Sequence, residues 1–194
     1  MTNILANSCY HDGMRSSSFT SILLAAAAAL ALAACSPTYN WRDFSSADAP
    51  FRVMFPDKPA SHTRPVNLAG LKLDMTMTAA QVQGTTFAVG AAEAPNADQA
   101  EAALAAMKTA LVKNIGATIT SEKAAKTSSA SGAAKARSAA LEIDAKGSSK
   151  GVPMRLVAHF ESRDKRIYQV LVLGPEKEMS KENIDMFMSS FTLQ

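Results

Sequence analysis

The chain has 194 residues, of which 47% are hydrophobic and 19% are charged, and its formal net charge at pH 7 is +3. This small, scattered excess of basic residues argues against a nucleic-acid-binding protein, which concentrates its Lys and Arg on one surface. Its two cysteines are Cys9 and Cys35, so the sequence after Cys35 offers neither a disulfide nor a cysteine ligand for a metal.

The first recognisable element is an apolar segment of 13 residues at positions 22–34. A helix needs about 20 residues to cross a bilayer, so this length fits the hydrophobic region of a signal peptide. Arg15 precedes the segment and small residues end it, as in secretory signals. Residues 1–34 are therefore predicted to be a signal peptide. Residues 1–13 contain no Lys or Arg, which favours Met14 as the true start.

The signal segment ends in Leu32-Ala33-Ala34-Cys35, which resembles the lipobox of bacterial lipoprotein precursors position by position. In that family a diacylglycerol group is attached to the cysteine thiol, and a dedicated peptidase cleaves before the cysteine. The resemblance implies that Cys35 is lipidated and anchors the protein in the cell envelope. Ser36 is compatible, in that family, with the periplasmic face of the outer membrane. The alternatives are an ordinary secretory signal with an incidental cysteine, or a buried alanine-rich helix.

Removing residues 1–34 leaves 160 residues with an unchanged net charge of +3, because the removed segment contains one acidic and one basic residue. This length is sufficient for one domain with its own core. We interpret residues 35–49 as a lipidated tether and residues 50–194 as an α+β domain. Trp41 and Phe44 are expected either to pack on the edge of the domain or to rest at the lipid interface.

Alternation of apolar and polar residues predicts the first strands of the domain. Residues 51–55 and 71–78 alternate strictly, and the second of these strands is expected to form a hairpin with residues 86–92 through the turn Gln83-Gly84. Between the first two strands, residues 57–65 contain two prolines and a histidine. This segment is expected to be a loop.

A helix is predicted after Asn96, which is a suitable N-cap residue. Apolar residues recur there at spacings of three and four and define one buried stripe. Gly116 is placed to end the helix. The stripe consists of Ala100, Leu104, Met107, Leu111 and Ile115.

The C-terminal part is predicted to contain further antiparallel strands and a final helix. Residues 166–174 are apolar at nearly every position, so this strand is expected in the middle of the sheet with both faces covered. Residues 127–136 are small and polar, which predicts a flexible loop. The remaining predicted elements are strands at 117–126, 137–145 and 152–162 and a helix after Ser180 that buries Ile184, Phe187, Met188 and Phe191.

This order of elements predicts an α+β fold with a single antiparallel sheet of about six strands and helices packed on its faces. The opening Phe51-Arg52-Val53-Met54-Phe55-Pro56 and the closing Phe187-Met188-Ser189-Ser190-Phe191 resemble the PsbP/Mog1-like superfamily, in which bacterial lipoproteins of the DcrB type are placed. The resemblance covers residues 48–194. Members of this superfamily mostly act as accessory or binding proteins, so the resemblance implies a non-catalytic role and no particular partner.

Few side chains of the predicted domain point to catalysis or metal binding. His62 and His159 alone do not supply the three or four ligands of a typical metal site. Ser129-Ala130-Ser131-Gly132 lacks the strand-to-helix turn that a serine hydrolase needs. Most of the methionines fall on core positions and are expected to fill the core. The acidic residues of the predicted strands are expected on their solvent-facing sides: Asp74, Glu142 and Asp144.

We therefore expect a membrane-anchored envelope lipoprotein that acts as a non-catalytic accessory or protein-binding module, with a protein partner in the envelope and without a cofactor, a metal or a nucleic acid. A protein that binds a small ligand or a lipid is the alternative, and a hydrolase comes third. An exposed apolar patch would favour the first function. A pocket lined by Met and Phe would favour the second, and converging acids with raised pKa values would favour the third.

Overall fold

The computed structural model describes residues 37–128 and 138–194. The folded unit spans Tyr39–Gln194. Its described part contains two sheets and two α-helices, and strands account for 55% of the described residues. The predicted signal peptide, Cys35 and the serine-rich segment 129–132 lie outside the described residues.

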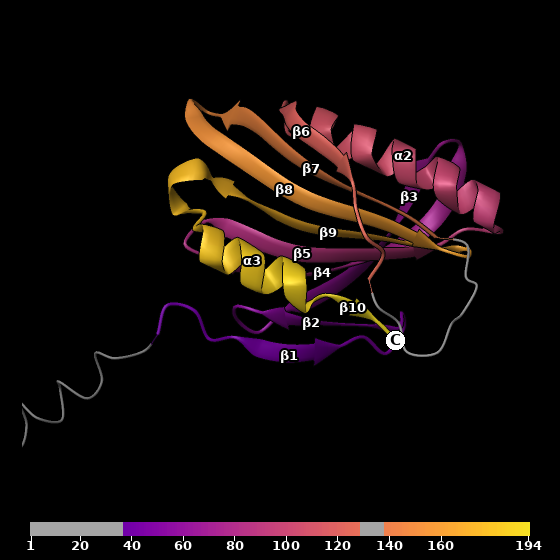
Figure 1. Ribbon diagram of the computed structural model, residues 1–194, viewed down its shortest axis with the longest axis horizontal. Coiled ribbons are helices and arrows are strands. Elements are labelled where there is room, and N and C mark those ends of the chain that lie inside the picture. Colours follow the sequence, from indigo (N-terminus) through magenta and orange to yellow (C-terminus); the bar gives the residue numbers. More distant parts are fainter. Residues whose placement is uncertain (1–36, 129–137) are drawn as a thin grey trace, which may run out of the picture. The chain divides into compact units, whose positions relative to one another are not determined.

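The larger sheet has seven antiparallel strands in the order β3-β4-β5-β9-β8-β7-β6 (Figure 1). The predicted hairpin is confirmed, because β4 pairs with β5 across the turn at Gln83-Gly84. The apolar strand predicted for the middle of the sheet is also confirmed as β9, the central strand, which is buried on both faces. The strands are β3 (Ala60–Leu68), β4 (Leu71–Val82), β5 (Thr85–Glu93), β6 (Thr118–Ala124), β7 (Ser138–Ser149), β8 (Val152–Arg163) and β9 (Arg166–Pro175).

A second, smaller sheet joins β1 (Arg42–Ser45), β2 (Phe51–Phe55) and β10 (Thr192–Leu193) in the order β1-β2-β10. The prediction of a single sheet of about six strands is therefore wrong. The protein is mostly β, with sheets of three and seven strands and only two α-helices in its described part. Strand β1 lies within residues 35–49, which were interpreted as tether.

Strand β3 replaces the loop that was expected at residues 57–65. It lies at an edge of the large sheet and pairs only with β4, so most of its side chains are exposed on both faces. An edge strand of this kind shows no alternation of apolar and polar residues. It also tolerates Pro65, because a proline lacks only the N–H that an edge strand can leave unpaired.

The first helix, α2 (Ala97–Asn114), agrees with its prediction. The Asn96 side chain caps its N-terminus by accepting a hydrogen bond from the Gln99 N–H at 2.9 Å. At the other end Gly116 has a φ of +59°, a left-handed conformation that glycine adopts without strain. Its N–H donates to the Lys113 carbonyl at 3.1 Å.

The second helix, α3 (Lys181–Ser190), follows the short 3-10 helix η1 (Glu176–Glu178). The Ser180 hydroxyl caps α3 by accepting a hydrogen bond from the Asn183 N–H at 3.2 Å. Ile184 and Phe187 are buried beneath the helix. The predicted cap and buried side of the final helix are therefore confirmed, with Met188 only partly buried.

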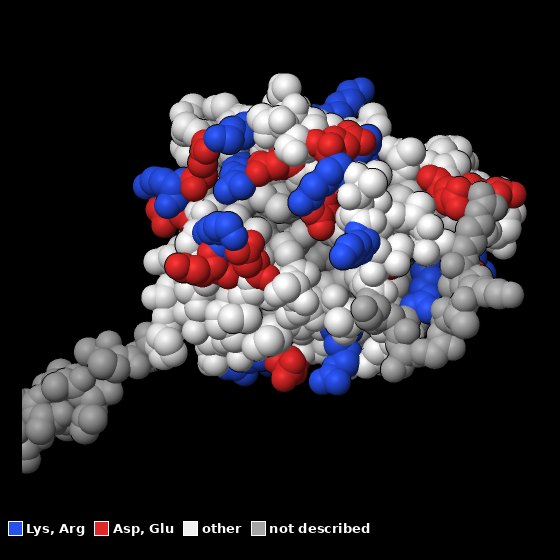
Figure 2. Space-filling view, in the orientation of Figure 1, with Lys and Arg blue, Asp and Glu red and all other residues white. Residues whose placement is uncertain are grey.

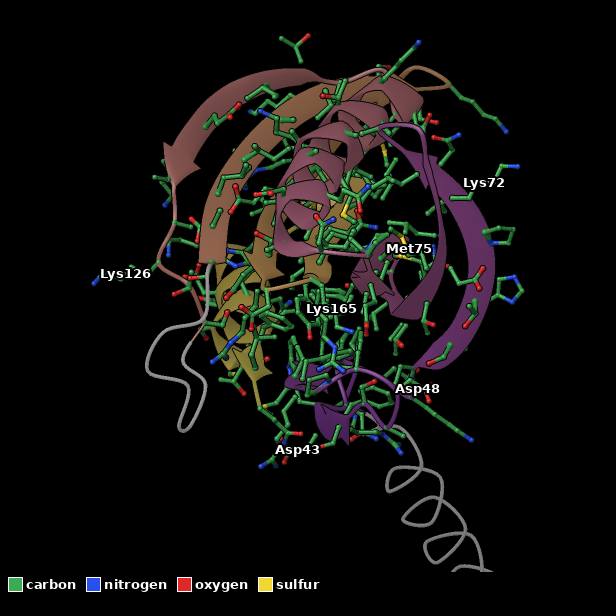
Figure 3. All side chains as sticks on the ribbon, turned by 90° about the vertical axis from the view of Figure 1, so that its right-hand side faces the viewer. Asp43, Asp48, Lys72, Met75, Lys126 and Lys165 are labelled. Carbon is green, nitrogen blue, oxygen red and sulfur yellow. The ribbon has the colours of Figure 1, made fainter. Side chains whose placement is uncertain are left out.

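Each face of the seven-stranded sheet has its own hydrophobic core. The sheet curves around α2, as Figure 3 shows, and the helix buries Ala100, Leu104 and Met107 against one face. On the opposite face, α3 and the three-stranded sheet cover a second core. The second core includes Phe51, Phe55, Phe87, Tyr168, Phe187 and Phe191.

The aromatic residues at the start of the domain belong to this second core. Trp41 stacks on Tyr39 with ring centroids 6.1 Å apart and meets Phe87 edge-on at 6.0 Å. Phe44 contacts Phe55 edge-on at 5.6 Å. Of the two alternatives for Trp41 and Phe44, packing on the domain is therefore confirmed.

Candidate functional site

The layer of α3 and the three-stranded sheet covers only part of its face of the large sheet. The core residues Val170 and Val172 of β9 are paired in register with His159 and Val157 of β8. Directly paired residues of antiparallel strands point to the same face, so this face continues from β9 across β8, β7 and β6. Its residues change along the way from apolar to charged. Its charged members include Arg155 on β8, Glu142, Asp144 and Lys146 on β7, and Lys123 on β6.

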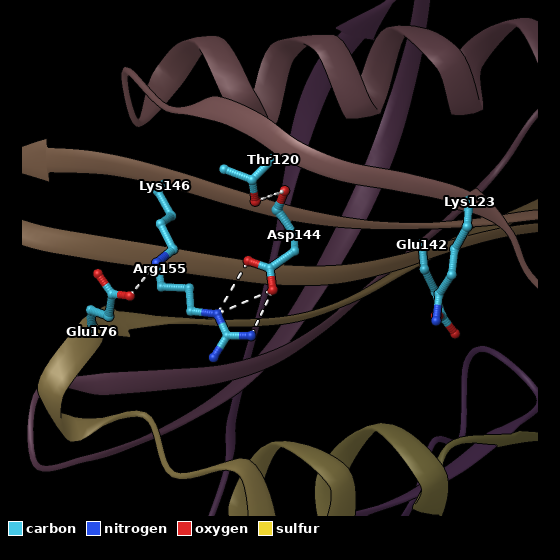
Figure 4. A network of polar contacts seen from close by, with 7 residues as sticks. All are labelled: Thr120, Lys123, Glu142, Asp144, Lys146, Arg155 and Glu176. Carbon is cyan, nitrogen blue, oxygen red and sulfur yellow. Dashed lines mark hydrogen bonds and ion pairs between the residues drawn. The ribbon is translucent and has the colours of Figure 1, made fainter.

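A groove of about 540 Å³ lies between α3 and this charged part of the sheet. Figure 2 shows acidic and basic side chains around a hollow on this face, and Figure 4 shows the charged residues of the sheet above α3. Val157, Ile184 and Met188 supply its apolar lining. The remaining lining residues are Lys123, Glu142, Arg155, Lys181, Asp185 and Ser189.

The charged residues on the sheet side of the groove are held in ion pairs (Figure 4). The Arg155 guanidinium binds Asp144 through two nitrogens, with Nη2 2.6 Å from Oδ2 and Nε 3.1 Å from Oδ1. This hydrogen bond raises the pKa of Arg155 above its usual value. Lys123 Nζ lies 2.8 Å from Glu142 Oε2, and that contact raises the pKa of Lys123. The bidentate contact with Asp144 fixes the plane of the Arg155 guanidinium, whereas the single contact with Glu142 leaves the Lys123 ammonium free to rotate.

A chain of polar contacts leads from the groove into the domain. Glu142 Oε1 lies 3.7 Å from His159 Nδ1, and His159 Nε2 lies 3.0 Å from Glu161 Oε2. Glu161 is fully buried, and both of its oxygens accept the N–H of Ser128 at 3.0 Å. These contacts hold the His159 imidazole between the side chains of Glu142 and Glu161. They also tie the segment that follows β6 to the interior of the domain.

The structure separates several residues that the sequence had singled out. His62 is exposed on the edge strand β3, whereas His159 lies on β8 and is only 8% exposed. Asp74 lines a different cavity of about 150 Å³, together with Glu93 and Arg166. In that cavity a hydrogen bond from Lys165 lowers the pKa of Glu93.

Other residues lie at the groove in roles that the sequence had not suggested. Glu142 and Asp144 lie on the outward phase of β7, as expected, but both are only partly exposed and are ion-paired, Glu142 in the groove and Asp144 with the lining residue Arg155. Met188 lines the groove, whereas Met75 and Met107 fill the other core as expected. Residues 129–132 lie outside the described residues.

Sequence reasoning missed Arg155, Glu161 and the contribution of α3 to the groove. One signal was present: Arg155, Val157, His159 and Glu161 occupy every second position of β8, opposite the buried Leu156, Ala158 and Phe160. When alternate residues of a strand are all apolar and the residues between them are mixed, the apolar side faces a core. The mixed side then faces a partly open surface. The burial of Glu161 has no such signal in the sequence.

No protein-family model matches the chain, and no curated protein matches its sequence. Within residues 37–128 and 138–194, no helix is long and apolar enough to cross a membrane. The same residues hold no group of three or more His, Cys, Asp or Glu side chains arranged to bind a metal ion. The large hydrophobic residues exposed in the described part of the chain are Val152, at 43%, and Met186, at 46%.

Proposed function

We propose that the chain is a bacterial lipoprotein of the cell envelope, anchored through Cys35, and that its domain binds an extended segment of a partner protein in the groove beside α3. The anchor is supported by the resemblance of Leu32-Ala33-Ala34-Cys35 to a lipobox and by the short apolar segment before it. The role of the domain is supported by the groove. No part of this proposal requires catalysis.

The observation that carries the binding role is the mixed lining of the groove. Five of the nine lining residues are charged, and an apolar strip of Val157, Ile184 and Met188 lies among them. A polypeptide offers the matching combination of apolar side chains, charges and backbone hydrogen-bonding groups. An acyl chain or an apolar small molecule prefers a site with a predominantly apolar lining. The groove therefore favours a protein segment over a lipid.

Site-specific crosslinking in living cells tests this role. A photoreactive amino acid is placed at Ser189, which lines the groove, or at Met186, which is exposed on the same helix but is not a lining residue. Each variant is made with Cys35 intact and with Cys35→Ala. The expected result is one crosslinked partner from position 189 only, and only when Cys35 is present.

Two results would contradict the proposal. Equal crosslinking from positions 186 and 189 would show that the groove does not select the partner. A lack of any crosslink at position 189, while the protein is folded and lipidated, would leave the groove without a partner and favour small-ligand binding. Met188→Lys provides a second test, because a charge in the apolar strip should abolish a crosslink that Val152→Lys, at an exposed position that does not line the groove, should leave unchanged.

A further inference from the structure

The folded domain begins very close to the proposed lipid anchor. Tyr39 is held in place by its contacts with Trp41 and with Phe87, whose ring centroid lies 6.3 Å away. The next residue, Asn40, donates its backbone N–H to the Pro56 carbonyl at 2.8 Å. The chain is therefore fixed from Tyr39 onward, well before residue 50.

Only residues 36–38 lie between Cys35 and this fixed point. A fully extended chain spans at most about 3.6 Å per residue, so the step from Cys35 to Tyr39 covers at most about 14 Å. A lipidated Cys35 lies at the membrane surface. The end of the domain that contains Tyr39 must then lie within that distance of the lipid headgroups.

Several turns meet at this end of the domain. The β2–β3 turn begins at Pro56, which contacts Asn40, and Phe87 follows the β4–β5 turn. Gly84 of the β4–β5 turn lies beside Pro175 at the end of β9. The β7–β8 turn belongs to the same end, because Met154 of β8 pairs with Pro175 and Lys146 of β7 forms an ion pair with Glu176 of η1. Figure 1 shows η1 and the β4–β5 and β7–β8 turns at one end of the large sheet.

We propose that this end, which we call the tethered end, contacts the surface of the bilayer. It is defined by the turns at residues 56–59, 83–84 and 150–151 and by η1. The inference rests on the proposed lipidation of Cys35 and deepens it, because it assigns the membrane a specific face of the domain. The short tether between Cys35 and Tyr39, rather than an excess of positive charge, brings this end to the bilayer.

The chemistry of the tethered end suits a lipid headgroup region. Three exposed lysines lie there, one in the β2–β3 turn, one in the β7–β8 turn and one in η1, and the acidic residues Asp57 and Glu178 lie next to two of them. Lysine ammonium groups near an anionic surface attract lipid phosphates. Lys181, at the start of α3 three residues after η1, lines the groove, so the groove begins close to the bilayer and a partner segment bound there would be membrane-proximal. The three lysines are Lys58, Lys150 and Lys177.

The test uses the lipidated full-length protein, reconstituted in vesicles of phosphatidylethanolamine and phosphatidylglycerol. The rate at which an amine-reactive reagent labels each lysine is measured by mass spectrometry. The matched variant carries a flexible Gly/Ser insertion of about 40 residues between Pro37 and Thr38, which adds roughly 35 Å of mean reach. Lys72 and Lys165 serve as internal controls, because they lie at the opposite end of the sheet (Figure 3).

The expected result is labelling of Lys58, Lys150 and Lys177 that is about fivefold slower in the wild type than in the insertion variant, with unchanged rates at Lys72 and Lys165. Equal rates in both proteins at the tethered end would overturn the inference. So would equal slowing at both ends of the sheet. The mass of the peptide that begins at Cys35 is read from the same digest, and a peptide without lipid means that the proposed anchor itself has failed. A lipidated peptide with unprotected lysines means that only the orientation is wrong.

Discussion

Glu161 holds a fully buried carboxylate between the imidazole of His159 and the backbone of Ser128. Alanine at this position would leave both of these groups without their acceptor, and an unsatisfied polar group inside a protein is costly. We expect Glu161→Ala to lower the free energy of unfolding by about 3 kcal/mol. Glu161→Gln keeps an acceptor for the Ser128 N–H and should cost about 1 kcal/mol. Urea denaturation measures both values.

The exposed Glu182 in the first turn of α3 provides the control. Glu182→Ala should change stability by less than about 1 kcal/mol. A cost of that size for Glu161→Ala as well would show that the contacts of Glu161 with His159 and Ser128 do not stabilise the fold. The polar contacts that link Glu142, His159, Glu161 and Ser128 would then be a consequence of packing alone.

Tyr168 links stability to alkaline pH. Burial raises the pKa of its phenol above the ordinary value of 10.0. Because the folded pKa is higher than the unfolded one, stability is fully present below the unfolded pKa and is lost as the pH rises through the folded pKa. The unfolding free energy of the wild type should therefore fall more steeply above about pH 10 than that of Tyr168→Phe, which has no phenol proton to lose. Urea denaturation at a series of alkaline pH values measures this, and parallel curves would contradict the assignment.

At the scale of elements, Gly174 of β9 lies too close to the paired strand β5 to leave room for a Cβ. A Cβ at this position would lie 2.8 Å from the Thr85 Cα and 2.5 Å from its Oγ1. The Cα belongs to the paired strand, so it cannot move without disturbing the β5–β9 ladder. We expect Gly174→Ala to lower the free energy of unfolding by about 2–3 kcal/mol, as measured by urea denaturation.

Gly90, in the middle of β5, is the matched comparison. A Cβ there would meet Met77 Sδ at 2.6 Å and Gln169 Cγ at 2.8 Å. Both atoms belong to flexible side chains that can shift, so Gly90→Ala should cost only about 1 kcal/mol. If Gly90→Ala were the more damaging of the two, side-chain packing rather than strand approach would limit this part of the sheet.

Elements with one buried and one exposed face could be predicted from the sequence, because burial imposes a period on their residues. The hairpin of β4 and β5, the helix α2 and the β8 strand show such a period and were confirmed. Strand β3 has no buried face along most of its length, and β10 has only two residues. Pairing with a neighbour, rather than their own residues, makes these two segments strands. The small sheet was missed because β1 and β10, the two neighbours of β2, show no such period.

The groove was less predictable than the fold, since its two sides come from segments far apart in the chain. His159 was correctly placed on the polar phase of its strand, and Ile184 and Phe187 on the buried side of the last helix. Nothing in either segment specifies that α3 stops short of β7 and β6. That arrangement follows from how far the second core extends across the sheet, which is a property of tertiary packing.

At the scale of the whole molecule, the proposed lipid anchor makes attachment to a membrane depend on Cys35. A thioether to diacylglycerol requires the thiol of this residue, so Cys35→Ala cannot carry the lipid. We expect the wild type in the membrane fraction, with a lipidated N-terminus at Cys35, and Cys35→Ala without the mass of the lipid. Cys9→Ala is the matched control, because Cys9 precedes both Met14 and the predicted cleavage site. Cys9→Ala should be found in the membrane fraction with a lipidated N-terminus at Cys35, as the wild type is.

The intact mass of the uncleaved Cys35→Ala precursor also identifies the start of translation, because a chain that begins at Met14 lacks residues 1–13. If the wild type were bound to the membrane but its N-terminal peptide at Cys35 lacked the mass of the lipid, the lipid could not be the anchor. The 14 Å limit that the tether sets on the domain would then lose its basis. The proposed membrane attachment and the proposed orientation of the tethered end thus depend on the same thiol, whereas the proposed binding in the groove depends on the residues of α3 and β6–β8 that line it.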